Sequence, residues 1–219
     1  MLFKRKCKIT FIAHGATLYT EENRICDKES HPPLNEQGQE EAERIAKWII
    51  HRSPRVDKIY TGASLSCVQT AQYVAKEYGQ DFEIRPELRN QEYGEWKGLS
   101  YTEIEERYPD QLQKYHDLTS SYAPEGGETL LEFDERVDAT INNLIEENLT
   151  RRIIVVTHSN FIRAAIRNAL DIPVENQNRV FIPTGSASQV KYYKGWNILM
   201  YSGPVSYTHL RAHETRSNL

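Results

Sequence analysis

The chain has 219 residues, 39% of them hydrophobic and 26% charged, and a formal net charge of -4 at neutral pH. This length and balance fit one globular domain with a sizeable core, and a mildly acidic chain without a basic run argues against nucleic acid or an anionic membrane as partner. Three scattered cysteines argue against a disulfide framework or a zinc ribbon, so a reducing cytoplasm is the expected location.

The first predicted element is a buried strand whose apolar run includes Ile9, Phe11 and Ile12. It breaks at His14 and Gly15, which places an imidazole where the strand opens into a glycine turn. The apolar run is too short for a signal peptide or a transmembrane helix, so neither is expected.

Two helices and a short strand are predicted next. After a polar loop from Tyr19 to His31, Asn35 can cap a helix running to about Arg52, because the apolar residues of this stretch recur at helical spacing. A short strand is expected over 56–60, and the run 61–71 leads into a helix that ends near Gly79.

The second half repeats the same alternation of helices and strands. A polar helical region over 101–118 is expected to cover the crevice, and a helix with one apolar stripe is expected from about Thr129 to Asn148. The run 153–156 is apolar at every position, as in a strand covered by helices on both faces, and His158 follows it. The last predicted strands span 180–182, 187–193 and 196–201, the final pair joined by a turn at Lys194 and Gly195.

These elements predict an α/β fold, a single-domain three-layer sandwich whose mostly parallel sheet has helices on both faces. The predicted domain spans 1–204, and 205–219 is expected to be a disordered or non-native tail, because it has no convincing periodicity. In open α/β sheets, ligands bind beyond the carboxyl ends of the strands. His14 and His158 are therefore expected to share one crevice.

Five separated stretches, 13–17, 32–38, 61–71, 86–98 and 124–129, resemble motifs of the histidine phosphatase superfamily, the phosphoglycerate-mutase-like proteins. The family signature Arg-His-Gly-x-Thr corresponds here to residues 13–17, with His14, Gly15 and Thr17 matching and Ala13 in place of the arginine. The resemblance implies phosphomonoester hydrolysis through a phosphohistidine on His14, with His158 donating to the phosphoryl group. It implies a small phosphorylated metabolite or phosphate as ligand and no cofactor, and leaves the oligomeric state open.

Two further motifs depart from the family at charged positions. The run 61–71 resembles Ser-Ser-Pro-x-x-Arg-Ala-x-Gln-Thr-Ala, so Ser66 falls where the second phosphate-binding arginine is expected and Gly62 where a serine is usual. The run 88–98 resembles Leu-x-Glu-x-x-x-Gly-x-Trp-x-Gly, which places Asn90 at the position of the glutamate proton donor. A serine hydroxyl cannot replace a bidentate guanidinium, and an asparagine cannot deliver a proton at neutral pH.

The predicted function is therefore that of a histidine-phosphatase-family protein with severely impaired or absent activity, a pseudoenzyme. One alternative is an active phosphomonoesterase on small phosphorylated metabolites, with Arg89, Lys97 or Arg163 compensating for the lost charges. Another is a non-catalytic module that binds a ligand or a partner protein. A further alternative is a transition metal held by both imidazoles, with Asn90 or water completing the shell. No ligands recur at i, i+4 spacing to support it, so the predicted site contains no metal.

Overall fold

The computed structural model describes residues 5–26, 32–117 and 120–204, so the predicted tail at 205–219 lies outside the described residues. A six-stranded sheet with the order β3-β2-β4-β1-β5-β6 forms its centre. The strands are β1 (Arg5–Ala13), β2 (Lys58–Thr61), β3 (Glu83–Ile84), β4 (Arg152–Thr157), β5 (Ser186–Tyr193) and β6 (Asn197–Pro204).

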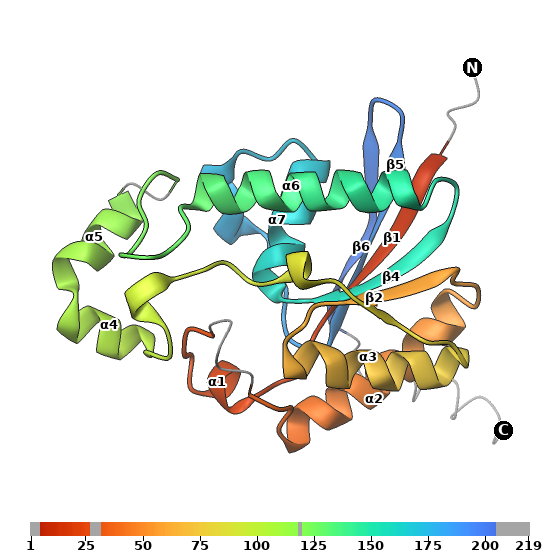
Figure 1. The fold of residues 1–219 in the computed structure, drawn as a ribbon, viewed down its shortest axis with the longest axis horizontal. Coiled ribbons are helices and arrows are strands. Elements are labelled where there is room, and N and C mark those ends of the chain that lie inside the picture. Colours follow the sequence, from red (N-terminus) through yellow and green to blue (C-terminus); the bar gives the residue numbers. More distant parts are fainter. Residues whose placement is uncertain (1–4, 27–31, 118–119, 205–219) are drawn as a thin grey trace, which may run out of the picture.

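The first four strands of the sheet order are parallel, whereas β5 runs antiparallel to β1 and β6 antiparallel to β5. Helices cover both faces of this sheet (Figure 1). The chain thus has the predicted α/β architecture with a mostly parallel sheet.

Two helix pairs build the outer layers. On one face lie α2 (Glu36–Arg52) and α3 (Leu65–Tyr78), and on the other α6 (Leu130–Glu147) and α7 (Ser159–Ala169) (Figure 1). Alternation along β1 explains the two cores, because Ile9 and Phe11 pack toward α6 and α7 whereas Ile12 packs toward α2 and α3. Each face of the central strand is therefore buried.

The helix caps follow the sequence signals. Asn35 caps α2, its side chain accepting a hydrogen bond from the Gly38 N–H, as predicted. Thr129 and Glu132 form a capping box at the start of α6. At the other end of α3, Gly79 takes a left-handed conformation and ends the helix.

The polar region predicted over 101–118 is two short helices, α4 (Tyr101–Arg107) and α5 (Pro109–Asp117), which project beyond one end of the sheet (Figure 1). The break falls at Tyr108, because the residue before a proline disfavours the helical conformation and Pro109 is pre-set to begin a new helix. A third apolar cluster, centred on Trp96 and Ile104, holds these helices against the loops before them.

The remaining elements are short: α1 (Leu18–Glu21), η1 (Pro86–Leu88), η2 (Gly94–Trp96) and η3 (Val174–Arg179). The strand predicted over 180–182 is wrong, since this segment is irregular. The N–H of Val180 donates to the Gln177 carbonyl and closes η3, while the Val180 carbonyl accepts from Arg163, so neither group is available to a strand partner.

Candidate active site

Two paired strands deliver the histidines to one crevice. Ala13 at the end of β1 pairs with Thr157 at the end of β4, and the His14 N–H donates to the Thr157 carbonyl at 3.0 Å. The next residue of each strand is a histidine. The rings of His14 and His158 lie with centroids 5.0 Å apart and planes at 79°.

The hydrogen bond of His14 fixes its tautomer. Nδ1 lies 2.8 Å from the carbonyl oxygen of Gly15, which can only accept, so Nδ1 carries the proton and Nε2 keeps its lone pair. Burial lowers the pKa of His14, although the Gly15 hydrogen bond and the charge of Glu41 act to raise it. A neutral imidazole with an available Nε2 is the form that nucleophilic catalysis requires.

The turn after His14 is held from two helices. The Gly15 N–H donates to Thr70 Oγ1 at 3.1 Å, and the Ala16 N–H donates to the buried carboxylate of Glu41 at 2.9 Å. A Cβ on Gly15 would lie 2.2 Å from the carbonyl oxygen of Gly38, so only glycine fits against α2 here. Gly15 and Glu41 therefore fix the backbone that carries the imidazole.

His158 lies against the first turn of α3. Its Nε2 is 3.3 Å from the Ser64 hydroxyl and 3.7 Å from the Cys67 sulfur. Burial raises the pKa of Cys67 to about 12, so this thiol stays protonated at neutral pH and is not a nucleophile. Sequence reasoning missed Ser64, whose position as the N-cap of α3 was a usable signal.

A cavity of about 240 Å³ opens at these histidines. Five predicted site residues line it, namely His14, Thr17, Ser66, Asn90 and His158.

The other positions predicted for the site, Ala13, Gly15 and Gly62, are buried and do not line the cavity. Ala13 is fully buried among the residues that pack toward α6 and α7, and a Cβ on Gly62 would lie 3.1 Å from the carbonyl oxygen of Leu88. Ala13 and Gly62 therefore belong to the wall behind the cavity.

Asn90 is positioned by a charged network. The guanidinium of Arg136 donates to the backbone carbonyl of Asn90 at 3.0 Å and forms an ion pair with Glu128 at 2.6 Å. Glu128 also accepts from the Glu92 N–H at 3.1 Å. Within the described part of the chain, the buried side-chain oxygen of Asn90 has no hydrogen-bond partner. The network thus holds a neutral amide where the family resemblance expects an acid.

The arginine that does line the cavity is Arg24, which sequence reasoning missed inside a polar loop. Its Nε lies 2.5 Å from a carboxylate oxygen of Glu22, and its Nη1 lies 2.6 Å from one of Glu103 and 3.0 Å from the Gly98 carbonyl oxygen. The two carboxylates offset its charge.

The residues considered as compensating cations are directed elsewhere. Arg89 lies 3.4 Å from carboxylate oxygens of both Glu92 and Glu128. Arg163 donates to the Val180 carbonyl at 2.9 Å and to Asn160 at 3.2 Å. These arginines and Lys97 are absent from the lining of the cavity.

Sequence reasoning also missed the polar and aromatic rim. Tyr93, Tyr101, Ser159 and Asn160 line the cavity, and the amide of Asn160 donates to the Tyr93 hydroxyl at 3.1 Å. Tyr93 lies within the motif at 88–98, which was a signal for its proximity. Within 5–26, 32–117 and 120–204, no group of three or more His, Cys, Asp or Glu residues could hold a metal ion.

The model of the histidine phosphatase superfamily (branch 1) matches residues 9–202, almost the whole described fold. The chain belongs to this family. Family membership agrees with the sequence resemblance and with the placement of the crevice at the strand ends.

The chain is also similar to individual proteins, in sequence and in fold. The chain is 26% identical over 166 residues to phosphoglycerate mutase-like protein 4 of Arabidopsis thaliana, covering 74% of this chain and 70% of that protein. It is 24% identical over 176 residues to glucosyl-3-phosphoglycerate phosphatase of Mycolicibacterium vanbaalenii, covering 77% and 76%. The fold resembles the α-ribazole phosphatase of Shigella flexneri with a TM-score of 0.80 and 19% identity, covering 89% of this chain and 95% of that one.

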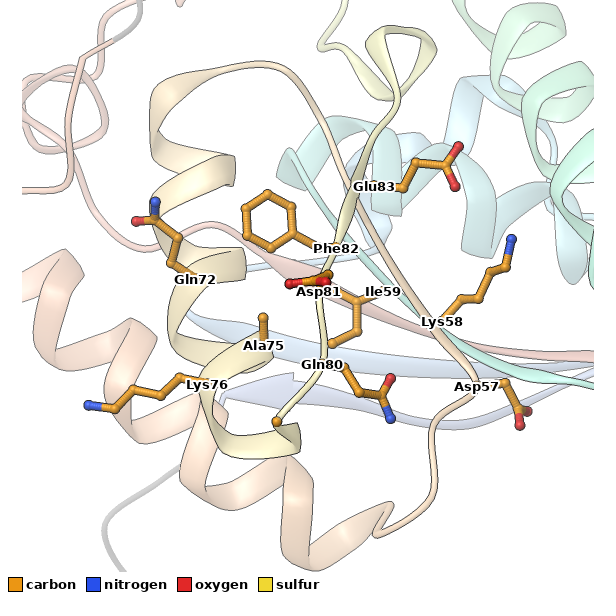
Figure 2. A pocket seen from close by; sticks show the side chains of 11 residues that line it. Asp57, Lys58, Ile59, Gln72, Ala75, Lys76, Gln80, Asp81, Phe82 and Glu83 are labelled. Carbon is orange, nitrogen blue, oxygen red and sulfur yellow. The ribbon is translucent and has the colours of Figure 1, made fainter.

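A larger and more open cavity of about 900 Å³ lies away from the crevice, between the end of α3 and the edge of the sheet (Figure 2). Its lining mixes acidic and basic side chains such as Lys76, Asp81 and Glu83 around Phe82. None of the residues predicted for the site belongs to it. In the described part of the chain, no helix is both long and apolar enough to cross a membrane.

Proposed function

We propose that this histidine-phosphatase-family protein has severely reduced or no phosphomonoesterase activity and still binds phosphate or a small phosphorylated metabolite weakly. One observation carries the proposal: the cavity presents both histidines, while Ser66 and Asn90 supply neutral groups and Ala13 supplies none. The nucleophile position is therefore intact, but the groups that the family places around the phosphoryl oxygens are not.

The missing cations would have stabilised negative charge on the phosphoryl group. Phosphoryl transfer depends on positioning and on stabilising charge spread over the phosphoryl oxygens. Hydrogen bonds to charged groups contribute about 1.5–3 kcal/mol each, so the loss of two guanidinium groups removes roughly 4 kcal/mol or more of stabilisation. Loss of the general acid typically costs about 10² to 10⁴ in rate. These contributions are not additive, yet either one is severe.

Residual anion binding is supported by two helices. α3 begins at Leu65 and α7 at Ser159, and residues of both first turns line the cavity. Helix N-termini favour anions through their unpaired backbone N–H groups and the helix dipole. The N-caps Ser64 and His158 make no side-chain capping bond, so these N–H groups are not satisfied in that way.

The deciding experiment is steady-state hydrolysis of p-nitrophenyl phosphate by the natural chain and by a triple variant, Ala13→Arg, Ser66→Arg and Asn90→Glu. We expect the triple variant to be at least about a thousandfold faster, because it restores two guanidinium groups and a carboxylic acid. The variant Lys76→Arg, in the other cavity, is the matched control for added guanidinium and should leave the rate unchanged.

Comparable, substantial activity of the natural chain and the triple variant would overturn the proposal, since the catalytic charges would then lie elsewhere. If neither protein hydrolyses the aryl ester, titration calorimetry with orthophosphate decides the binding claim. Tighter binding by the triple variant supports the assigned positions, and identical binding contradicts them.

A further inference from the structure

A third cavity, also of about 240 Å³, lies at the opposite end of the sheet from the crevice. Its lining comes mainly from the C-terminal halves of α6 and α7 and from the hairpin that joins β5 and β6. None of the residues predicted for the active site contributes to its lining. The cavity is therefore separate from the proposed phosphate site.

Tyr192 on β5 supplies a deeply buried polar group to this cavity. The residue is 5% exposed, and its buried hydroxyl has no hydrogen-bond partner among the residues that the structure describes. Burial raises the pKa of Tyr192, and the nearby Cys7 and Asp138 act in the same direction, so the phenol stays neutral. An unpaired buried hydroxyl is costly, and a ligand group that donates a hydrogen bond to its oxygen would reduce that cost.

The charge around the cavity is negative. Asp138, Glu146 and Asp171 line it against the single ammonium of Lys6 among the lining residues. Asn142 donates to one oxygen of Asp138 at 3.0 Å, which leaves the other oxygen available. The C-terminal turn of α7, with Asn168 and Ala169, also belongs to the lining, and helix C-termini favour cations.

The remaining walls are apolar and aromatic. Ile141 and Ile145 of α6 face Ala165 of α7, and the rings of Tyr193 and Trp196 stack at the rim with centroids 4.8 Å apart. Aromatic faces attract organic cations, and apolar walls accept methylene groups. The volume is below the roughly 300–1,000 Å³ typical of drug-sized ligands, which favours a small one.

We infer that this cavity binds a small aliphatic primary amine, with one ammonium group donating to the Tyr192 hydroxyl and to Asp138 and with methylene groups against Ile141 and Ile145. A diamine fits the charge best, because its second ammonium group reaches the acidic rim at Glu146 and Asp171. Inorganic phosphate does not fit this cavity, because the acidic side chains in its lining outnumber the single ammonium group.

The test is titration calorimetry of the full chain with 1,4-diaminobutane, with 1-butanol as the uncharged probe of similar apolar length. We expect saturable binding of the diamine and none of the alcohol. Tyr192→Phe keeps the ring and removes the acceptor, so we expect affinity to fall about tenfold, and Asp138→Asn should lower it similarly. Glu105→Gln on α4 removes the same charge far from the cavity and should leave affinity unchanged.

Absence of saturable diamine binding to the natural chain would overturn the inference. Equal weakening by Glu105→Gln would also overturn it, since the diamine would then follow net charge and not this cavity. If Tyr192→Phe fails to fold, as judged by circular dichroism, Asp138→Asn decides the result alone: unchanged affinity contradicts the site, and a tenfold loss supports it.

Discussion

At the scale of single residues, the protonation of His14 links the crevice to stability. Its pKa is lowered in the folded protein from the ordinary value of 6.5, because burial disfavours the imidazolium. The unfolded chain therefore binds a proton at higher pH than the folded one. Stability contributed by neutral His14 is present above pH 6.5 and is lost as the pH falls from there toward the folded pKa.

We expect His14→Gln to lose less stability than the natural chain between pH 7.5 and pH 5.5, because glutamine cannot be protonated. Each pKa unit of lowering corresponds to about 1.4 kcal/mol. Urea unfolding at the two pH values measures the difference. Identical losses in both proteins would mean that His14 is not buried in its neutral form.

Glu41 acts on the same imidazole from α2. Its charge raises the pKa of His14, against the larger effect of burial, while one carboxylate oxygen accepts from the Ala16 N–H. Glu41→Gln keeps an acceptor and removes the charge, so we expect the NMR titration midpoint of His14 to move to lower pH. The neighbouring exposed variant Glu40→Gln should leave it in place, and an upward shift in Glu41→Gln would refute the argument.

At the scale of elements, α2 lies so close to the turn after β1 that replacing a glycine of this helix by alanine should have the opposite of its usual effect. Replacing glycine by alanine inside a helix usually stabilises by about 0.5–1 kcal/mol. Gly38 lies in the first turn of α2, but a Cβ there would lie 1.9 Å from the carbonyl oxygen of Ala16. We therefore expect Gly38→Ala to destabilise by about 1–3 kcal/mol in urea unfolding. Gln39→Ala, one residue on and exposed, should change stability by less than about 0.5 kcal/mol.

The packing of α6 on α7 includes an ion pair whose arginine is buried. Arg167 of α7, whose side chain is 3% exposed, pairs with Asp134 of α6 and also donates to the Ile172 carbonyl at 3.0 Å. Asp134→Ala leaves a buried charge without its partner, so we expect a loss of about 3–5 kcal/mol. Glu135→Ala is the exposed control. A double variant with Asp134→Leu and Arg167→Met should recover most of the loss, and failure to recover would show that the charges themselves stabilise the fold.

Local sequence signals were sufficient for most elements. α2 was predictable because its cap, Asn35, and its apolar spacing both act within the helix. The convergence of His14 and His158 was predictable because both follow strands of one parallel sheet.

The failures have a common cause in contacts between distant segments. Val180, Phe181 and Ile182 have the composition of a strand, but Phe181 is 77% exposed and the backbone of Val180 bonds to η3 and Arg163. Arg24 lines the cavity because its loop folds back to the crevice. The spacing of apolar residues along the sequence does not indicate where a polar loop folds back.

At the scale of the whole molecule, ligand binding adds to the free energy of unfolding. A ligand that binds only the folded state stabilises it by about 2.7 kcal/mol at a concentration of 100 Kd. We expect orthophosphate to raise the melting temperature of the natural chain slightly, and that of the Ala13→Arg, Ser66→Arg, Asn90→Glu variant much more. Sodium chloride at matched ionic strength is the control, and an equal rise in chloride would mean that the effect is not specific to phosphate.

The central position of β1 has a consequence for biosynthesis. Of the six strands it is the first to be synthesised, yet its sheet neighbours are β4 and β5, which follow α6 in the chain. Domains generally fold as units during synthesis, and long-range strand pairing is slow. Both edges of the apolar strand β1 therefore stay unpaired until β4 and β5 have been translated, and the face that packs against α6 and α7 stays uncovered until those helices have been made. A chain that ends before β4 cannot form this sheet, and we expect its unpaired apolar strand to make it prone to aggregation.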